Sequence, residues 1–518
     1  MTQGDKETSG KEISFPRRTL LKGAAATTVL SAMPWGVRQA FAQQAFDLVV
    51  IGGGTAGIPA AIFAADRGAR VVIIEKAPAV GGTLFLSGGM VAGARTVFQK
   101  AKGIEDSPDA HYDDIMRISL HTADPELARL WADNGGPTIN WLAENGFTIR
   151  DGQPVTGAGY DPYLIPRYLQ GPAAGVSILN VMKPLLDRHV QEGRVVVLTA
   201  AAAVNLIKDG RGAVTGVVTQ DSAGKRSDIL GRNVIIASGG YAANPTMFEN
   251  LQGIPLYKRV AYPYSQGDGL SLGLGAGGYL RGADNLVQYY GSIAVDDKIP
   301  SAMAANMSLV QRAPWEVYVN ARGERFVQED TPSRGALDRA MDLQPGHRFW
   351  AVFDQQILDQ APPLIEPKSS QGFADWPREK LLDAFNKHPM FTRAVSLGEL
   401  GVITGIDPAG LEKSIRDYNQ AIEKGLPDRF ERSYRPLQVA KPPFYAIRSQ
   451  AWTLKSYAGL AVNKDLQVIS KEGKPVPNLY AAGEALGAAT SGKSHTSGGS
   501  VTPALAFGRL LGQKIIRF

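Results

Sequence analysis

Residues 45–57 read AFDLVVIGGGTAG, and this stretch decides the fold class of the chain. The apolar run at 46–51 has the length of a strand and predicts one that is buried in a parallel sheet. The loop at 52–57 has the form G-x-G-x-x-G, and residues 58–67 have the composition of a helix. A strand, a glycine loop and a helix in this order place free N–H groups where they can bind a phosphate.

A second strand is predicted at 70–74, and it ends in Glu75, 18 residues beyond Gly57. Gly52 permits the tight turn, Gly54 lets the backbone approach a pyrophosphate, and Gly57 allows close packing of helix and strand. Glu75 can accept hydrogen bonds from the hydroxyls of an adenosine ribose and would repel a 2′-phosphate. These features predict dinucleotide binding. The candidate pyrophosphate residues are Gly52, Gly54, Thr55, Ala56 and Gly57.

Small residues further along the chain favour FAD over NAD. Residues 81–83 read GGT and residues 87–89 read SGG, and such loops let a backbone come close to a flavin ring. The runs NVIIASGGY (233–241) and NLYAAGE (478–484) resemble buried strands that end in small residues. A second G-x-G-x-x-G copy at 273–278 has no strand before it and no acid after it, so we interpret it as a packing feature.

Six blocks occur in a characteristic order along nearly the whole chain. They read GGGTAG, EKAPAVGGTLFLSGG, NVIIASGGYAANP, SQGDGLSLGLGAGG, VYVNARGERFVQED, and NLYAAGEALG followed by GGSVTPALAFGRLLG. In these blocks the chain resembles the fumarate reductase/succinate dehydrogenase flavoprotein superfamily, which includes soluble fumarate reductases, urocanate reductase and 3-ketosteroid Δ1-dehydrogenases. The resemblance implies an α/β fold with a Rossmann-like FAD-binding domain (glutathione-reductase-like βαβ) and an inserted α+β capping domain. We expect the first at 43–285 plus 448–518 and the second at 286–447.

The resemblance also implies which residues hold the cofactor. Glu75 would bind the adenosine ribose, and Glu484 would bind the ribityl hydroxyls. The last helix would begin at Ser500 and Val501 and face the flavin ring, where its dipole favours an anionic reduced flavin. Gly82 stands where membrane succinate dehydrogenases carry a flavin-linking His, so non-covalent FAD is expected. Further expected contacts are Lys76, Gly82, Thr83, Ser87, Gly88, Gly89, Ala237, Ser238, Gly239 and Asp268.

In this superfamily a hydride moves between the flavin and one carbon of a C–C bond, while a protein group handles the proton on the neighbouring carbon. Fumarate reductases use two His and two Arg, but the matching blocks here differ. Tyr290 and Lys455 stand in place of the two His, and the block HTSGG at 495–499 lacks the Arg that clamps a carboxylate. Arg334 follows Glu329 one residue later than the proton donor of the family. The candidate catalytic residues are Arg334, His495, Tyr290, Lys455 and Tyr457.

These changes favour a neutral or singly charged carbonyl compound, since a small dianion needs at least two fixed cations. The main hypothesis is an FAD-dependent oxidoreductase that acts on a CH–CH or C=C bond α,β to a carbonyl or carboxylate. The alternative is a fumarate-reductase-like reductase of enoates or dicarboxylates. Distant alternatives are a non-catalytic flavoprotein and a P-loop NTPase, because GAATSGKS at 487–494 fits the P-loop pattern. A P-loop helix should start directly after Ser494, but the helical pattern begins near Ser500.

Composition argues against several other classes of protein. The 518-residue chain contains no cysteine, which rules out disulfides, iron–sulfur ligation and thiolate catalysis. Its six His have no H-E-x-x-H or H-x-H spacing, so we expect no metal. The net charge of +6 is modest, and we expect no nucleic-acid partner. Because no haem motif is present, we expect a small-molecule substrate and a separate electron partner, such as a quinone, a cytochrome or a small acceptor.

Residues 1–42 have the pattern of a targeting segment. Arg17 and Arg18 precede a mildly apolar run, and residues 40–42 read AFA, a small-residue cleavage site. This resembles a twin-arginine export signal with cleavage after Ala42, so we expect a periplasmic or otherwise exported protein that meets the twin-arginine translocase. The apolar run is too short for a stable membrane span.

Overall fold

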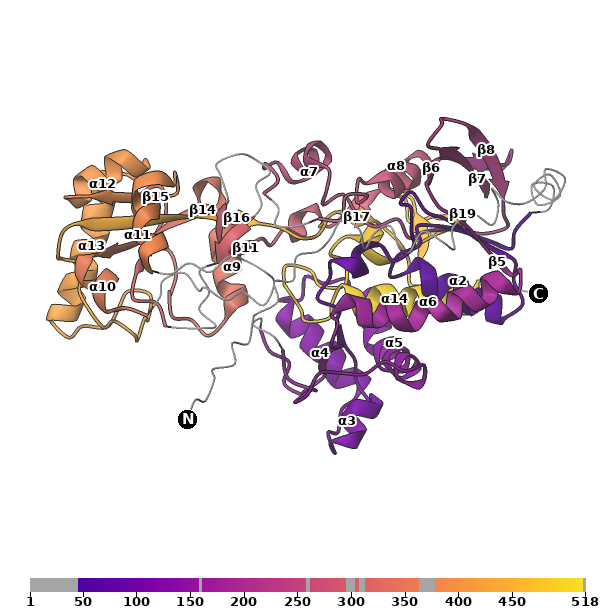
Figure 1. Ribbon diagram of the computed structural model, residues 1–518, viewed down its shortest axis with the longest axis horizontal. Helices are drawn as coiled ribbons and strands as arrows, with labels where there is room; N and C mark the ends of the chain where they lie inside the picture. The colour runs from indigo at the N-terminus through magenta and orange to yellow at the C-terminus, as the bar shows by residue number, and fades with distance from the viewer. Residues whose placement is uncertain are drawn as a thin grey trace, which may run out of the picture.

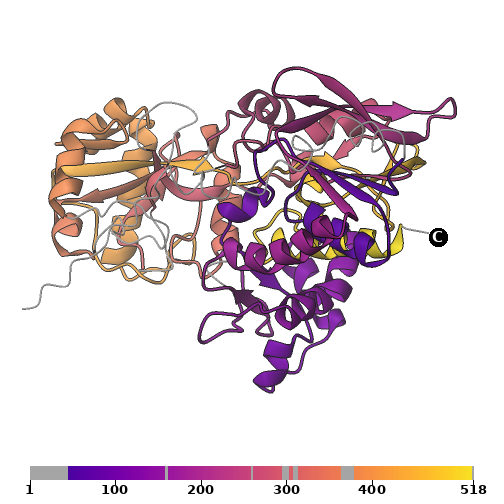
Figure 2. The same ribbon diagram turned by 45° about the vertical axis from the view of Figure 1, so that its right-hand side comes forward.

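The computed structural model describes residues 45–157, 161–257, 261–294, 303–306, 313–362 and 378–515, and every structural statement below concerns these residues. The predicted signal at 1–42 lies outside them. The described chain forms two lobes, each with its own sheet and its own apolar core (Figure 1). Figure 2 shows the second lobe, drawn mainly in orange, standing beside the first.

The first lobe is built on a six-stranded sheet in the order β18-β19-β9-β1-β2-β5. Its strands are β1 (Leu48–Ile51), β2 (Val71–Ile74), β5 (Val195–Leu198), β9 (Val234–Ile236), β18 (Gln467–Ile469) and β19 (Pro475–Ala481). Neighbours pair in parallel except β18 and β19, which pair antiparallel. β1 and β2 are buried at every residue, which explains why both runs are continuously apolar.

The helix predicted after the glycine loop forms as α2 (Gly57–Asp66), and Gly68 follows it with φ +88°. The last helix, α14 (Val501–Lys514), packs closely against it: a Cβ on Gly508 would lie 2.0 Å from the carbonyl oxygen of Ala56. Figure 1 shows yellow α14 beside α2 and α6 (Gly175–Gln191), below the sheet. The end of the chain therefore completes the unit that its start begins.

Further elements surround this sheet. They are α3 (Val97–Ala101), α4 (Pro108–Ile118), α5 (Pro125–Glu144), α7 (Pro245–Gln252), α8 (Asp268–Gly275), the antiparallel set β6 (Ala201–Lys208), β7 (Val214–Asp221) and β8 (Arg226–Leu230), the pairs β3 (Met90–Ala92) with β4 (Tyr168–Gln170) and β10 (Leu280–Arg281) with β17 (Gly459–Leu460), and the short 3₁₀ helices η2 (Gly82–Phe85), η3 (Ala283–Asn285) and η5 (Gly483–Leu486). The second glycine motif begins inside α8, where a Cβ on Gly273 would lie 2.4 Å from Leu460, as expected for a packing feature.

The second lobe contains a sheet of order β12-β11-β16-β14-β13, with β15 also paired to β16. Its elements are β11 (Tyr289–Ala294), β12 (Met303–Asn306), β13 (Val317–Val319), α9 (Arg334–Asp342), η4 (Pro345–His347), β14 (Arg348–Asp354), α10 (Gln355–Gln360), α11 (Arg378–Lys387), β15 (Phe391–Ala394), α12 (Leu397–Thr404), α13 (Pro408–Glu423) and β16 (Phe444–Trp452). β16 runs past the predicted boundary at 447 and leads the chain back toward the first lobe (Figure 1). The predicted fold class, a Rossmann-like domain with an inserted α+β domain, is confirmed.

None of the helices in the described ranges combines the length and the apolar character needed to cross a membrane.

Candidate functional site

The loop after β1 has the geometry of a phosphate cradle. Gly52 has φ +103°, and a Cβ there would lie 2.5 Å from the carbonyl oxygen of Ala237. A Cβ on Gly57 would lie 1.9 Å from the carbonyl oxygen of Gly52. Both positions require glycine, because any side chain would collide with backbone. Thr55 and the N-cap residue Ala56 lead into α2. In the first turn of α2 the N–H of Ile58 donates to the carbonyl oxygen of Gly54 and Pro59 has no N–H, so the N–H of Gly57 is the one that can donate to an anion.

Glu75 follows β2 and is tied to two backbone N–H groups. Its Oε2 accepts from Gly53 at 2.8 Å and its Oε1 accepts from Ala77 at 2.7 Å. Burial raises the pKa of this carboxyl, and the two hydrogen bonds oppose that rise. Each oxygen retains a further lone pair that can accept a ribose hydroxyl. The adjacent Lys76 pairs with Asp268 at 2.7 Å, and both line a cavity of about 360 Å³.

The predicted flavin loop at 82–89 begins beside the glycine loop. A Cβ on Gly54 would lie 4.0 Å from the Cα of Gly82, so the two loops face each other without a collision. Thr83 follows Gly82 in η2 and is exposed. The two backbones are nearly in contact here, since a Cβ on Gly82 would lie 3.2 Å from the Cα of Gly54.

The end of the same loop is held more tightly. Ser87 Oγ accepts from the N–H of Gly89 at 3.0 Å, and Gln170 donates to the carbonyl oxygen of Gly88 at 2.6 Å. Gly89 has φ +64°, and a Cβ there would lie 2.4 Å from the backbone of Ala174. The Ser87–Gly89 turn is therefore fixed against the start of α6.

Ala237, Ser238 and Gly239 follow β9 and border the glycine loop. The backbone of Ala237 is the group that Gly52 approaches, and Gly239 has φ +80°. Within the described residues, the Ser238 hydroxyl is buried and has no hydrogen-bond partner. An unpaired buried hydroxyl beside a phosphate cradle fits a site that a cofactor completes.

Glu484 lies where three segments of the first lobe meet. One carboxylate oxygen accepts from the N–H of Ser456 at 2.7 Å, and burial raises the pKa of Glu484. Ser456 Oγ accepts in turn from the N–H of Tyr241 at 2.6 Å. A Cβ on Gly240 would lie 2.0 Å from that same Oγ, so the packing here also requires glycine. The site thus combines the SGGY and AAGE segments with the chain that carries Lys455.

The connector at 487–500 does not form a P-loop. Ser494 donates to the carbonyl oxygen of Ser491 at 2.6 Å, and no helix starts among the described residues until Val501. Ser500 is the exposed N-cap residue of α14, and its side chain caps no N–H group of that described helix. Lys493 lies at the surface, 3.8 Å from Asp284. The NTPase alternative therefore lacks its phosphate-binding helix, as the sequence pattern indicated.

His495 is buried in this connector between an aromatic stack and a carboxylate. Its ring lies on that of Tyr289 at a centroid distance of 3.8 Å and an angle of 7°. Tyr289 in turn stacks on Trp452 at 4.5 Å, the residue opposite it across β11 and β16. On its edge, His495 Nε2 lies 3.7 Å from Oδ2 of Asp338, which is fully buried. The stack fixes the ring plane, and the carboxylate can orient the imidazole.

The sequence analysis did not predict Asp338 as a site residue, although its spacing from Arg334 could have indicated it. It lies in α9, one turn after Arg334, the first residue of that helix. An acid spaced by four residues from a nominated Arg lies on the same helix face. The side chains of Arg334 and Tyr290 lie outside the described residues; the backbone of Tyr290 belongs to β11. Ser333, at the family's proton-donor position, instead caps α9 by accepting from Ala336 N–H at 3.1 Å.

Lys455 reaches into the same region from the first lobe. Its Nζ donates to Ser491 Oγ at 3.2 Å and to the carbonyl oxygen of Ser494 at 3.3 Å. Burial lowers the pKa of Lys455 to about 8, and the nearby Glu484 carboxylate partly opposes this shift. A lysine with such a pKa can hold or release a proton near neutral pH.

The hydroxyl of Tyr457 is engaged by protein groups, whereas a donor to substrate needs a hydroxyl that faces the substrate. Its hydroxyl donates to the carbonyl oxygen of Val287 at 2.5 Å and lies 2.9 Å from the hydroxyl of Thr453. The side chain is 1% exposed, and burial raises the pKa of the phenol. These contacts favour a packing role that joins the start of the second lobe to the first.

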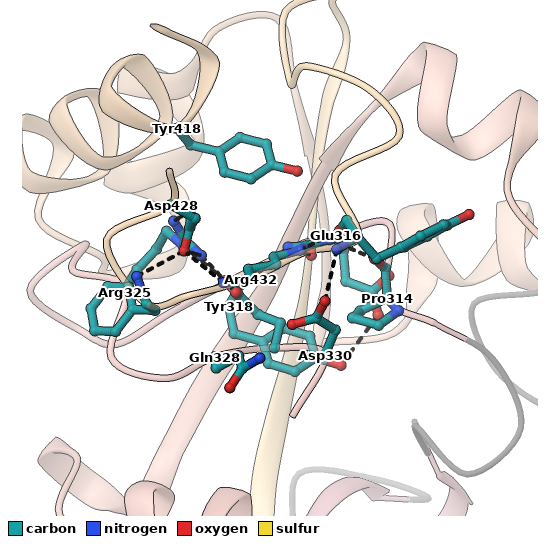
Figure 3. A network of polar contacts seen from close by, with 12 residues as sticks. Pro314, Glu316, Tyr318, Arg325, Gln328, Asp330, Tyr418, Asp428 and Arg432 are labelled. Carbon is teal, nitrogen blue, oxygen red and sulfur yellow. Dashed lines mark hydrogen bonds and ion pairs between the residues drawn. The ribbon is translucent and has the colours of Figure 1, made fainter. Parts of the chain in front are cut away.

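The block VYVNARGERFVQED at 317–330 surrounds a buried charge network in the second lobe (Figure 3). Arg325 donates to Glu329 at 2.9 and 2.7 Å and to Asp428 at 2.6 and 3.1 Å. Arg432 donates to three backbone carbonyl oxygens and lies 3.7 Å from Glu329. The network fixes the block that leads into α9, whose N-cap is Ser333.

A glycine cradle at a helix N-terminus and a buried acid after the second strand are the features of a dinucleotide-binding domain. The sequence matches the FAD binding domain family over residues 47–501, and the chain belongs to this family.

Several curated proteins are similar to the chain. Fumarate reductase (cytochrome) of Shewanella frigidimarina is 27% identical over 477 residues, which cover 91% of this chain and 77% of the relative. Urocanate reductase of Eggerthella lenta is 27% identical over 534 residues, covering 98% and 82%. Vinyl phenol reductase of Lactiplantibacillus plantarum is 27% identical over 455 residues, covering 85% and 89%.

A solved structure agrees with the fold. The 3-ketosteroid-Δ4-(5α)-dehydrogenase of Rhodococcus jostii RHA1 superposes with a TM-score of 0.67 at 22% identity, covering 95% of this chain and 98% of the other. The predicted superfamily and the FAD cofactor are confirmed. The predicted enzyme class, an FAD-dependent oxidoreductase of the CH–CH type, is also confirmed.

Proposed function

We propose that the enzyme either reduces a C=C bond or dehydrogenates a CH–CH bond, in each case α,β to the carbonyl group of a neutral or singly charged compound. When bound, FAD supplies the hydride exchange with one carbon of that bond. The first lobe would hold the cofactor through the glycine cradle at 52–57 and the carboxylates of Glu75 and Glu484. The N-terminus of α14 would stabilise negative charge on the flavin ring.

The observation that carries the substrate class is the pairing of His495 with Asp338 beside Lys455. Lys455 supplies one positive charge, while the charge of a protonated His495 would be balanced by Asp338, 3.7 Å away. Among the described side chains of this site, one uncompensated cation suits a single carboxylate or a polarised ketone better than a dianion. The flat ring of Tyr289 on His495 adds an apolar wall beside these groups.

The roles within this site follow from the chemistry of each side chain. Lys455 would donate a hydrogen bond to the carbonyl oxygen of the substrate and stabilise the enolate-like charge that develops there. His495, oriented by Asp338, would carry the proton of the neighbouring carbon. Arg334 and Tyr290 remain candidate catalytic residues because of their sequence positions. Tyr457 remains one for the same reason, although its hydroxyl makes packing contacts.

The second candidate is a reductase of enoates or dicarboxylates. The similarity to fumarate reductase of Shewanella frigidimarina favours it, whereas the similarity to vinyl phenol reductase favours a substrate with fewer charges. A non-catalytic flavoprotein is the third possibility, and the same experiment separates all three.

The experiment uses the purified holoenzyme with its FAD reduced under anaerobic conditions. Reoxidation is followed through the flavin absorbance with enones, monocarboxylic enoates, fumarate and quinones as separate probes. Rapid reoxidation by enones supports the proposal, and preference for monocarboxylic enoates or fumarate supports the alternative. Bleaching of the oxidised enzyme by saturated ketones would establish the dehydrogenase direction. If none of the enones, enoates, fumarate or saturated ketones reacts with the flavin, the protein is a non-catalytic flavoprotein.

We further propose that the chain is exported by the twin-arginine translocase and exchanges electrons with a quinone, a cytochrome or a small acceptor. Arg17, Arg18 and the AFA at 40–42 support export. Replacing both arginines by lysine should leave the protein uncleaved and inside the cell, as fractionation would reveal. Cleavage after Ala42 in that double variant would contradict the proposal.

A further inference from the structure

Residues 161–167, DPYLIPR, form a segment of the first lobe that we call the strap. Besides its base on α4, the strap contacts α9 of the second lobe, through its N-cap Ser333, and the connector that carries His495. These are the two elements that bring Asp338 and His495 together. The contacts of the strap therefore bear on the geometry of that pair.

The strap is anchored by a buried ion cluster. Arg167 donates to Asp106 at 3.0 and 2.7 Å and to Asp114 at 2.8 Å, and the side chains of all three are at most 1% exposed. Asp114 also accepts from the N–H of Leu164 at 2.9 Å. Removing one partner of such a buried cluster is costly, so the strap has a rigid base on α4.

From this base, Asp161 reaches the first turn of α9. Its Oδ1 accepts from the Ser333 hydroxyl at 2.6 Å, and its Oδ2 lies 3.7 Å from Arg339. The backbone of α9 comes so close that a Cβ on Gly335 would lie 2.3 Å from Oδ2. A carboxylate at a helix N-terminus is favoured by the helix dipole. Asp161 thus fixes the helix that carries Asp338.

Tyr163 fixes the other partner. Its hydroxyl donates a short hydrogen bond to the carbonyl oxygen of Ser497, two residues after His495. The ring is 2% exposed, and the guanidinium of Arg167 lies over it at 5.1 Å. The orientation of Tyr163 is therefore set by the same anchor that sets Asp161.

We propose that Asp161 and Tyr163 are positioning residues that set the His495–Asp338 geometry when the two lobes are together. The inference rests on the proposed function of the His495–Asp338 pair. Neither residue touches that pair directly; each acts through the backbone of the element it holds. Small displacements of a reacting group lower rates strongly, so loosening either contact should affect turnover more than substrate binding.

The test compares Asp161→Ala and Tyr163→Phe with the control Asp187→Ala, which removes an exposed ion pair to Lys183 in the same lobe. Each strap variant should lower kcat roughly tenfold while KM changes less, and FAD content should be retained. In an Asp338→Asn background, the same strap substitutions should lower kcat less than about twofold, because the group they position is already altered. The control should behave as the wild type in both backgrounds.

The inference would be overturned if the strap substitutions lowered kcat equally in the wild-type and Asp338→Asn backgrounds. It would also be overturned if they left kcat unchanged in the wild-type background. Amide hydrogen exchange supplies a readout that needs no turnover: Asp161→Ala should accelerate exchange in the first turn of α9, and Tyr163→Phe should do so around Ser497. If His495→Gln keeps full activity, the proposed function fails, while the exchange data still decide whether the strap holds these elements. If Asp161→Ala does not fold, Tyr163→Phe carries the test alone.

Discussion

The ring of Tyr289 lies flat on the imidazole of His495, 3.8 Å away between centroids, and these residues come from different lobes. Tyr289 is backed by Trp452 on the next strand. Two aromatic rings thus hold the plane of the imidazole, and the remaining freedom of His495 is limited by Asp338 at its edge. The arrangement joins the lobes at the point where we propose that substrate binds.

His495→Gln should lower kcat by roughly 100-fold, because proton transfer by a positioned side chain contributes about that factor or more. Asp338→Asn should reduce kcat less, since it removes only the orienting carboxylate. Steady-state kinetics with the best substrate from the panel would measure both. FAD content should stay at the wild-type level in each variant.

The matched control is His121→Asn, at an exposed position with φ +57°, where asparagine is well tolerated. Its turnover should equal that of the wild type. Full activity in both His495→Gln and Asp338→Asn would show that the proton is carried elsewhere, and Arg334 would then be the next residue to replace.

The nucleotide-binding core of the first lobe could be predicted because local sequence determines it. The strand β1, the glycine loop and α2 each have a local signature, and Gly57 tolerates no side chain in the folded chain. The end of the second lobe was less predictable: β16 continues to Trp452, past the expected boundary, because its pairing with β11 and β14 is set by distant strands.

The candidate site depends on contacts that no local pattern encodes. His495 was found because it lies in a glycine-rich turn before the last helix. Asp338 was missed, since its partner is far away in the chain and only the packing of α9 brings the two together. Tyr457 shows the opposite case. Its sequence position makes it a candidate donor to substrate, but in the structure its hydroxyl donates to the carbonyl oxygen of Val287.

Gly57→Ala should impair FAD binding and stability together. The added methyl would lie 1.9 Å from the carbonyl oxygen of Gly52, so the loop or α2 must shift. Overpacking of this kind costs about 1–3 kcal/mol. We expect a lower Tm and a reduced ratio of flavin to protein after purification. Gly210→Ala is the control, because a Cβ there meets no described atom within 4 Å; equal behaviour of the two variants would contradict the role of the cradle.

Asp428→Asn should destabilise the second lobe by about 1–3 kcal/mol, because Arg325 loses one of its two carboxylate partners in a buried position. Burial alone would raise the pKa of Asp428, but the hydrogen bonds from Arg325 outweigh it and the pKa is lowered. The stabilisation is therefore present above the unfolded-state pKa and is lost as the pH falls through the folded-state pKa. Denaturant unfolding at neutral and acidic pH would measure both effects.

For comparison, Asp417→Asn removes an exposed pair with Lys413 and should cost about 1 kcal/mol or less. If Asp428→Asn is no more destabilising than this control, the network of Figure 3 does not hold the lobe together.

The pH dependence of turnover should contain a limb from Lys455, whose pKa burial lowers to about 8. Below that pH the side chain is an ammonium group that can stabilise charge on a carbonyl oxygen, and above it the amine is neutral. In the reductive direction kcat/KM should therefore fall as the pH rises through about 8.

Lys455→Arg separates this limb from all others, because a guanidinium stays protonated throughout the range. The variant should lose the limb near pH 8 while retaining measurable reductive activity. Lys493→Arg, at the surface beside Asp284, is the matched control and should keep the wild-type profile. A limb that persists unchanged in Lys455→Arg would assign it to another group and remove Lys455 from the proposed site. A limb that disappears in both variants would point to a charge effect shared by the connector.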